Sequence, residues 1–188
     1  MAGQLRQTGT RQTGTRPMFS IAAGGSSSCA QTGQTGQQQC GTYTHPGLVA
    51  GSVILTADGA IPVEYLCPGD RIITRNAGLA RISAVHCVQY AGDFIQIAAR
   101  ALGATRPDSD TILPAAQTIL LRGQAALALT GQASALVPAQ ALARLPGVTP
   151  HDGIEMTLVQ LVFDAPQLVY ADGLETLCLP DARASLAA

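Results

Sequence analysis

The sequence of 188 residues predicts an all-β domain of mostly antiparallel strands with one short helix, preceded by a disordered segment. From Leu48 onward, short β-rich runs alternate with turn signals, a pattern typical of sandwiches and barrels. Apolar residues form 47% of the chain, enough for a core, whereas charged residues form only 12%. We expect a disordered tail at 1–46, the β-domain at 47–180 and a frayed tail at 181–188.

The segment 1–46 has low complexity. Gln-Thr-Gly recurs in RQTGT, RQTGT and QTGQTG, and large apolar residues are few. Such a chain cannot bury enough apolar surface to offset the entropy cost of ordering. We therefore expect it to be a flexible tether.

The first half of the domain predicts strands joined by tight turns. A strand at 52–56 precedes Asp58-Gly59, a pair that accepts the positive φ values of a hairpin turn. The next strand, 61–66, contains Pro62, which has no N–H to donate and therefore belongs at a strand start or at a sheet edge. Further strands are expected at 71–74, 79–90 and 94–98, with turns at 68–70 and 76–78.

The second half adds the helix and the most apolar strand. Residues 138–145 predict a short helix that begins with Pro138, because proline is well accepted at the first helical position. Residues 154–163 carry large side chains on both faces, so this strand should be central in its sheet. Other strands are expected at 117–122, 167–170 and 174–179, with a hairpin turn at Asp172-Gly173; 124–129 fits a strand or a helical turn.

The cysteines predict thiols in a reducing compartment. Their number, five, is odd, and none stands in a Cys-x-x-Cys pair. A zinc site is therefore disfavoured, and the three scattered histidines suggest no other site, so we expect neither a metal nor a cofactor. Cys67, Cys87 and Cys178 lie in apolar strand contexts and are expected to be small core residues.

Charge and hydropathy exclude two classes of partner. The 11 Lys and Arg residues are matched by 12 Asp and Glu residues, which argues against nucleic acid as a partner. No run approaches the roughly 18 consecutive apolar residues of a membrane helix. Residues 2–16 also lack the apolar stretch of a secretory signal. We expect no nucleic acid and no membrane.

A series of short motifs between Gly47 and Gly78 follows the order and spacing of a known family. The motifs are Gly51-Ser52, Thr56, Gly59, Pro62-Val63-Glu64, Leu66, Gly69-Asp70 and Thr74. Together they resemble the opening of bacterial Hint (hedgehog/intein) domains. The segments 101–107, 136–139, 158–164 and 169–175 resemble later parts of that family, so the likeness spans about 47–180.

The resemblance implies a horseshoe-like β-fold with pseudo-twofold symmetry, and it implies self-processing in active members. There a Cys at the first position attacks the preceding carbonyl, and a His of a Ser/Thr-x-x-His motif protonates the leaving nitrogen. In this chain Gly47 stands at the Cys position, Pro114 at the Ser/Thr position and Gln117 at the His position. Because an acyl shift needs a nucleophile and a proton donor, self-cleavage should fail.

Few other residues offer a substitute. Ser52 is a weak nucleophile without a base. Cys40 and His45 are expected to lie in the disordered tail, where no fixed geometry holds them together. His86 is expected to be a structural strand residue. His151 stands beside Asp152 in a loop with no Ser or Cys partner. The chain also lacks the terminal His-Asn of splicing inteins, which excludes two-sided splicing.

The leading hypothesis is a noncatalytic protein-interaction module with an unknown protein partner. Its rival is autocatalytic self-processing (an N-to-S or N-to-O acyl shift) through a different nucleophile, Ser52 or Cys40. A carbohydrate-binding β-domain is disfavoured because aromatic residues are few.

The last three residues resemble the end of a bacterial degradation tag read by AAA+ proteases; they are Leu186, Ala187 and Ala188. We expect a cytoplasmic protein, with export by a signal-peptide-independent system as the alternative.

Overall fold

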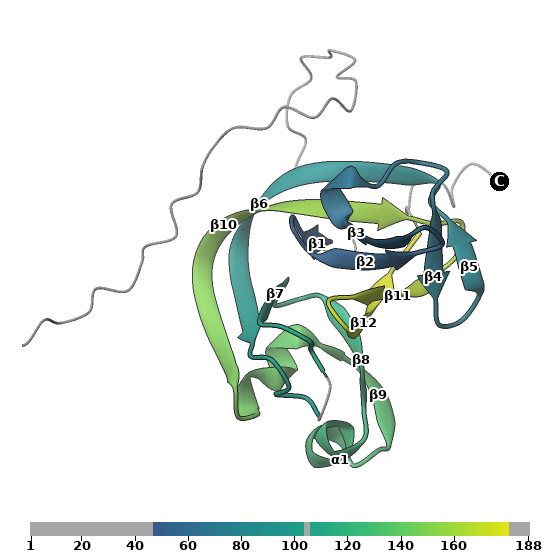
Figure 1. Cartoon of the computed structure of the whole chain (residues 1–188). Helices are drawn as coiled ribbons and strands as arrows, with labels where there is room; N and C mark the ends of the chain where they lie inside the picture. Colours follow the sequence, from purple (N-terminus) through teal and green to yellow (C-terminus); the bar gives the residue numbers. More distant parts are fainter. Residues whose placement is uncertain (1–46, 104–105, 181–188) are drawn as a thin grey trace, which may run out of the picture. The chain divides into compact units, whose positions relative to one another are not determined.

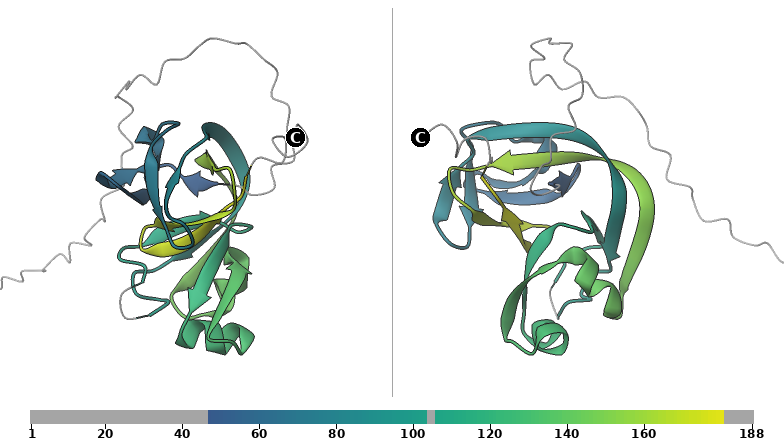
Figure 2. Two further views of the ribbon diagram at one scale, coloured as in Figure 1. Left: turned by 90° about the vertical axis from the view of Figure 1, so that its right-hand side faces the viewer. Right: turned by 180° about the vertical axis from the view of Figure 1, so that it is seen from behind.

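Two long antiparallel strands form a curved ribbon that organises the domain (Figures 1 and 2). They are β6 (Ala84–Ile97) and β10 (Val148–Val162). The computed structural model describes residues 47–103 and 106–180. Within these residues no helix is long and apolar enough to cross a membrane.

Each edge of this ribbon carries one short strand. β1 (Leu48–Val49) pairs with β10, and β7 (Thr111–Pro114) pairs with β6, so the order in this sheet is β1-β10-β6-β7. All three pairings are antiparallel. The strand at 154–163 is therefore central, as its two-sided apolar pattern predicts.

The second sheet has eight strands in the order β3-β2-β4-β11-β12-β8-β9, and β5 pairs with β4. Three helical segments accompany it: the 3-10 helices η1 (Val63–Tyr65) and η2 (Ala139–Arg144), and α1 (Gln124–Thr130). The strands are β2 (Val53–Thr56), β3 (Gly59–Pro62), β4 (Arg71–Thr74), β5 (Gly78–Arg81), β8 (Thr118–Arg122), β9 (Ser134–Pro138), β11 (Gln167–Ala171) and β12 (Leu174–Cys178). The mostly antiparallel all-β class is confirmed.

The two halves of the domain repeat one local arrangement. In the first half, the Ser52 carbonyl accepts a hydrogen bond from the Val63 N–H at 2.8 Å. In the second half, the Gln117 carbonyl accepts one from the Ala139 N–H at 2.8 Å. Each acceptor directly precedes a hairpin, and each donor begins a 3-10 helix that follows a proline. This repetition is the pseudo-twofold relation that the resemblance implies.

The apolar core follows the same division. One cluster gathers around β10 and includes Leu48, Val159 and Phe163, together with the buried apolar residues of β2, β4 and β11. A second cluster gathers around β6, β8 and η2 and includes Ile97 and Leu142. Because both clusters pack against the ribbon, β6 and β10 connect the two halves of the core.

Several predicted strands are wrong in their extent. The strand at 79–90 is divided between β5 and β6, because at Ile82 and Ser83 the backbone changes partners: Ile82 N–H donates to Asp70, and Ser83 N–H donates to Val162. The separate strand at 94–98 is the end of β6. The strand at 61–66 ends at Pro62, after which the chain turns into η1.

The remaining differences concern short elements. The ambiguous segment 124–129 is helical and belongs to α1, and the helix expected at 138–145 is the 3-10 helix η2. β7 and β9 were not predicted from the sequence. Both are short and contain residues without a strong strand preference, and both are held by pairing with a neighbour, β6 and β8 respectively.

The Asp172-Gly173 turn is confirmed and also ties distant strands together. Asp172 and Gly173 have φ values of 49° and 76°, so both take the left-handed conformation of a type I′ turn. The Asp172 carboxylate accepts hydrogen bonds from the Val53 N–H at 2.8 Å and from the Thr111 hydroxyl at 2.9 Å. One side chain thus joins the β11–β12 hairpin to β2 and β7.

Replacement Asp172→Ala is expected to lower the free energy of unfolding by about 2–3 kcal/mol. Two hydrogen bonds to the carboxylate are lost, and alanine takes the left-handed conformation less readily than aspartate. Chemical denaturation measures the change, with the exposed Asp152→Ala as a control that should shift stability by less than about 0.5 kcal/mol. Equal effects of the two variants would contradict a tying role for Asp172.

Candidate functional site

Gly47 lies directly before β1 and has no room for a side chain. Its φ is +100°, a conformation that favours glycine. A Cβ atom placed on it would lie 2.8 Å from the Val159 carbonyl oxygen and 2.9 Å from Cγ of Gln160. The first of these atoms belongs to the backbone of β10 and cannot rotate away. The position that the resemblance assigns to the nucleophile is therefore closely packed as well as lacking a nucleophile.

Gln160 is a buried polar residue beside Gly47 that the sequence reasoning missed. Leu48 pairs with Val159, which brings the preceding Gly47 next to Gln160. Gln160 is only 3% exposed, and the other residues of the stretch 158–163 are all apolar. A single polar residue inside this apolar stretch was the signal that could have identified it.

His86 lies on the other side of Gln160 and is exposed. The register pairs Gln160 with His86, so position 47, Gln160 and His86 follow one another across β1, β10 and β6. Two strand spacings separate the backbone of His86 from that of Gly47, which is about 9–10 Å. With Gln160 between them, His86 is not placed to deliver a proton directly to the Gly47 backbone.

Gln117 is fully buried and is held by hydrogen bonds to the backbone. Its amide Nε2 donates to the Leu177 carbonyl at 2.8 Å, and its own N–H donates to the Pro114 carbonyl at 2.9 Å. Its Oε1 has no hydrogen-bond partner among the described residues. A neutral amide can donate a hydrogen bond, but it cannot exchange a proton near neutral pH.

The structure brings the start of β1 and the end of β7 into one region. β1 contacts β7, and Val49 shares a small apolar cluster with Phe94, whose backbone pairs with Pro114. Gly47, directly before β1, and Pro114, at the end of β7, therefore lie in segments that are close in space, although β1 and β7 form opposite edges of their sheet.

Ser52 occupies, in the first half, the place that Gln117 occupies in the second. Its N–H donates to the Val49 carbonyl, and the residue is 6% exposed. Cys40 and His45 lie outside the described residues, as do Leu186, Ala187 and Ala188 of the C-terminal motif.

The described histidines and acids do not form a metal site. Within residues 47–103 and 106–180, no group of three or more His, Cys, Asp or Glu side chains could hold a metal ion. His151 lies 3.0 Å from Gln96 through its Nε2 atom. That contact lies across the β6–β10 ribbon.

The cysteines differ in their surroundings, and one expectation is wrong. Cys178 is buried in the apolar cluster that contains Leu48, and burial raises the pKa of its thiol from 9.0 to about 12. Cys67 is partly buried, whereas Cys87 is exposed and is not a core residue. At neutral pH the Cys178 thiol is protonated, so it is a poor nucleophile despite its position.

Residues 46–181 match the family model of the Hint domain, so the chain belongs to the Hint domain family. The family assignment rests on this match. No curated protein shows a significant match.

Several solved structures are similar over most of the chain. An intein-like domain from Clostridium thermocellum is 13% identical with a TM-score of 0.49, and the match covers 72% of this chain and 99% of that one. The TvoVMA intein is 12% identical with a TM-score of 0.49, covering 69% and 96%. The gp41-1 intein is 12% identical with a TM-score of 0.45, covering 69% and 96%.

Replacement Gly47→Cys is expected to destabilise the domain by about 2–4 kcal/mol. The new Cβ meets both an unfavourable φ and the β10 backbone. Gly51 is a matched control, because its φ is +95° and nothing lies within 4 Å of its Cβ position. Gly51→Cys should therefore cost only about 1 kcal/mol. Denaturation of both variants measures the difference, and equal losses would mean that packing at Gly47 is not restrictive.

The Cys178 thiol makes stability fall as pH rises from about 9 to about 12. In this window the unfolded thiol releases its proton while the folded thiol retains it, so the unfolded state gains up to about 1.4 kcal/mol per pH unit. The difference in unfolding free energy between the natural protein and Cys178→Ala should show this slope. Cys178→Ala should lack this slope, and the same slope in Cys178→Ala would contradict the assignment.

Proposed function

We propose that this Hint-family domain does not cleave its own backbone and acts as a noncatalytic protein-interaction module. The observation that carries the proposal is the packing at Gly47. An acyl shift begins with a side-chain nucleophile next to the scissile carbonyl, and this position has no side chain. A Cβ atom would overlap the Val159 carbonyl oxygen and Gln160, so the site is shaped around glycine.

The second step of the chemistry, protonation of the leaving nitrogen, also lacks a suitable residue. The leaving nitrogen of a cleaved peptide bond needs a proton donor whose pKa lies near the working pH. Gln117 has no titrating group, and its amide nitrogen is already engaged with the Leu177 carbonyl. Gln160, beside Gly47, is a second amide and has the same limitation.

Exposed apolar side chains on the second sheet support the interaction part of the proposal. Ile73 and Leu79 face each other on β4 and β5 and are 36% and 52% exposed. Leu55, on the neighbouring β2, is 42% exposed. Contiguous exposed apolar residues often mark contact surfaces. With only 12% charged residues in the chain, a largely neutral contact fits better than electrostatic steering.

The intact mass of the full chain tests the absence of self-cleavage. The chain is incubated with and without hydroxylamine or a thiol, which would release a thioester or ester intermediate. We expect one unchanged mass under all conditions. A fragment ending between residues 39 and 51 would instead support self-processing. Its loss in Ser52→Ala or in Cys40→Ala would identify the nucleophile.

A further inference from the structure

Glu175 on β12 is fully buried, and its carboxylate forms ion pairs with three arginines. Its Oε1 atom lies 2.8 Å from Arg106, 3.3 Å from Arg75 and 3.6 Å from Arg122, in each case from an Nη1 atom. The glutamate side chain has no exposed surface. A buried carboxylate is costly unless it is paired and hydrogen-bonded, so this residue fixes the positions of the guanidinium groups.

The cluster carries more positive than negative charge. Three guanidinium groups face one carboxylate, and among the described residues no other ion pair involves these arginines. Another acid, Asp108, has its carboxylate against Gly173, two residues before Glu175. Even if Asp108 is counted, the cluster remains positive. Arg106 and Arg122 are 41% and 46% exposed, so both can still meet an anion from solvent.

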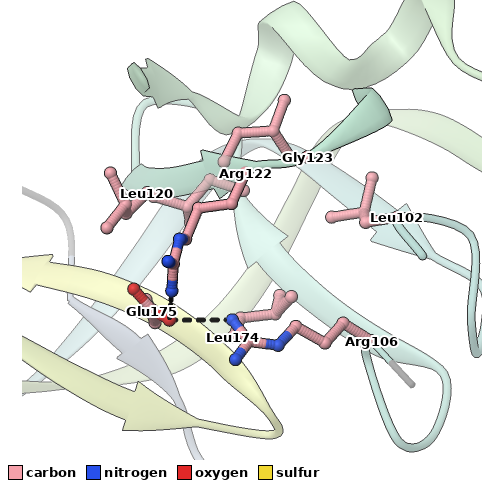
Figure 3. Close-up of a pocket in the computed structure, with 9 residues that line it drawn as sticks. Leu102, Arg106, Leu120, Arg122, Gly123, Leu174 and Glu175 are labelled. Atoms are coloured by element: carbon pink, nitrogen blue, oxygen red, sulfur yellow. Dashed lines mark hydrogen bonds and ion pairs between the residues drawn. The ribbon is translucent and has the colours of Figure 1, made fainter. Parts of the chain in front are cut away.

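An open cleft lies beside two of these arginines. Figure 3 shows Arg106 and Arg122 converging on Glu175 from two sides. The same cleft is lined by Leu102, Leu121 and Leu174. It therefore joins fixed cationic groups to an apolar wall, a combination typical of ligand sites.

We propose that this cleft binds a carboxylate carried on a small apolar group. The planar guanidinium fork matches a carboxylate, and the leucine wall matches an aliphatic body next to it. Such a group is supplied by the C-terminus of a peptide ending in an aliphatic residue or by a free aliphatic acid. A bare phosphate uses the arginines but leaves the apolar wall unused.

Glu175 itself gives an independent observation in favour of a ligand. Its second oxygen, Oε2, is buried and has no hydrogen-bond partner among the described residues. Buried carboxylate oxygens are normally satisfied, and an unsatisfied one calls for a missing partner. A ligand N–H, such as the terminal amide of a peptide, or a water held with the ligand would supply it. The inference goes beyond the proposed function and does not depend on whether the domain cleaves itself.

Calorimetric titration of the full chain tests the site with matched probes. The charged probes are 4-methylpentanoate and N-acetyl-Ala-Ala-Leu with a free carboxylate, and the neutral controls are the corresponding amides. We expect each carboxylate to bind at least tenfold more tightly than its amide, with weaker binding at higher salt. Tighter binding of the peptide assigns a peptide C-terminus as the source, and tighter binding of 4-methylpentanoate assigns a free acid.

Charge-removing variants locate the binding. Arg106→Gln and Arg122→Gln should each weaken carboxylate binding by about tenfold or more, because each removes one guanidinium from the cleft. Arg144→Gln removes the same charge from an exposed position on η2 and should leave binding unchanged. Circular dichroism confirms that each variant is folded before titration.

Three results would overturn the site: equal binding of acid and amide, equal binding by the Arg106→Gln and Arg144→Gln variants, or inorganic phosphate binding as tightly as 4-methylpentanoate. These titrations measure binding alone, whereas the intact-mass experiment measures cleavage alone. Failure of one proposal is therefore distinguishable from failure of the other.

Discussion

The antiparallel pairing of β6 with β10 is the constraint on which the rest of this domain depends. Their register runs from Ala84 opposite Val162 to Ile97 opposite Val148, with one irregularity between His151 and Ile154. The paired strands leave two edges, one on β10 and one on β6, and each edge can pair with one further strand. One edge accepts β1 and the other accepts β7, and both large core clusters include residues of this ribbon or packed against it.

The repeated arrangement of edge strand, turn and hairpin follows from this pairing. Each edge strand leaves the ribbon through a tight turn and enters a hairpin of the second sheet. Ser52 closes the first turn and Gln117 the second, with N–H to carbonyl distances of 3.0 and 2.9 Å. Both residues are buried. Ser52 and Gln117 therefore each have a structural role in closing a turn.

The two sites described above lie on different strands and are built on different physical principles. At Gly47 the limiting factor is space, because the β10 backbone approaches the chain too closely for a side chain. At Glu175 the limiting factor is charge, because a buried carboxylate collects guanidinium groups from three separate segments. The first uses β1 and β10, whereas the second uses β8, β12 and the segment before β7. A substitution at one of these sites should therefore leave the geometry of the other intact.

Local sequence patterns identified the elements that local chemistry controls. The strand at 71–74 and the Asp172-Gly173 turn were predicted because β-branched residues and left-handed turn residues specify them without distant partners. The family resemblance also led to Gly47, Pro114 and Gln117, since motif spacing is a property of the chain. Elements that depend on a partner were missed, such as β7 and β9, whose pairing is supplied by other strands.

The sequence by itself therefore determined the all-β class, the tight turns and which residues stand at the positions that the family resemblance assigns to the chemistry. Only the tertiary structure decided how those positions are packed and what lies beside them. Gln160 reaches Gly47 through strand pairing, and Arg75, Arg106 and Arg122 meet Glu175 from segments 53 to 100 residues away. The physical reason is that close packing and charge pairing act between atoms near in space, and the order of residues along the chain does not record those distances.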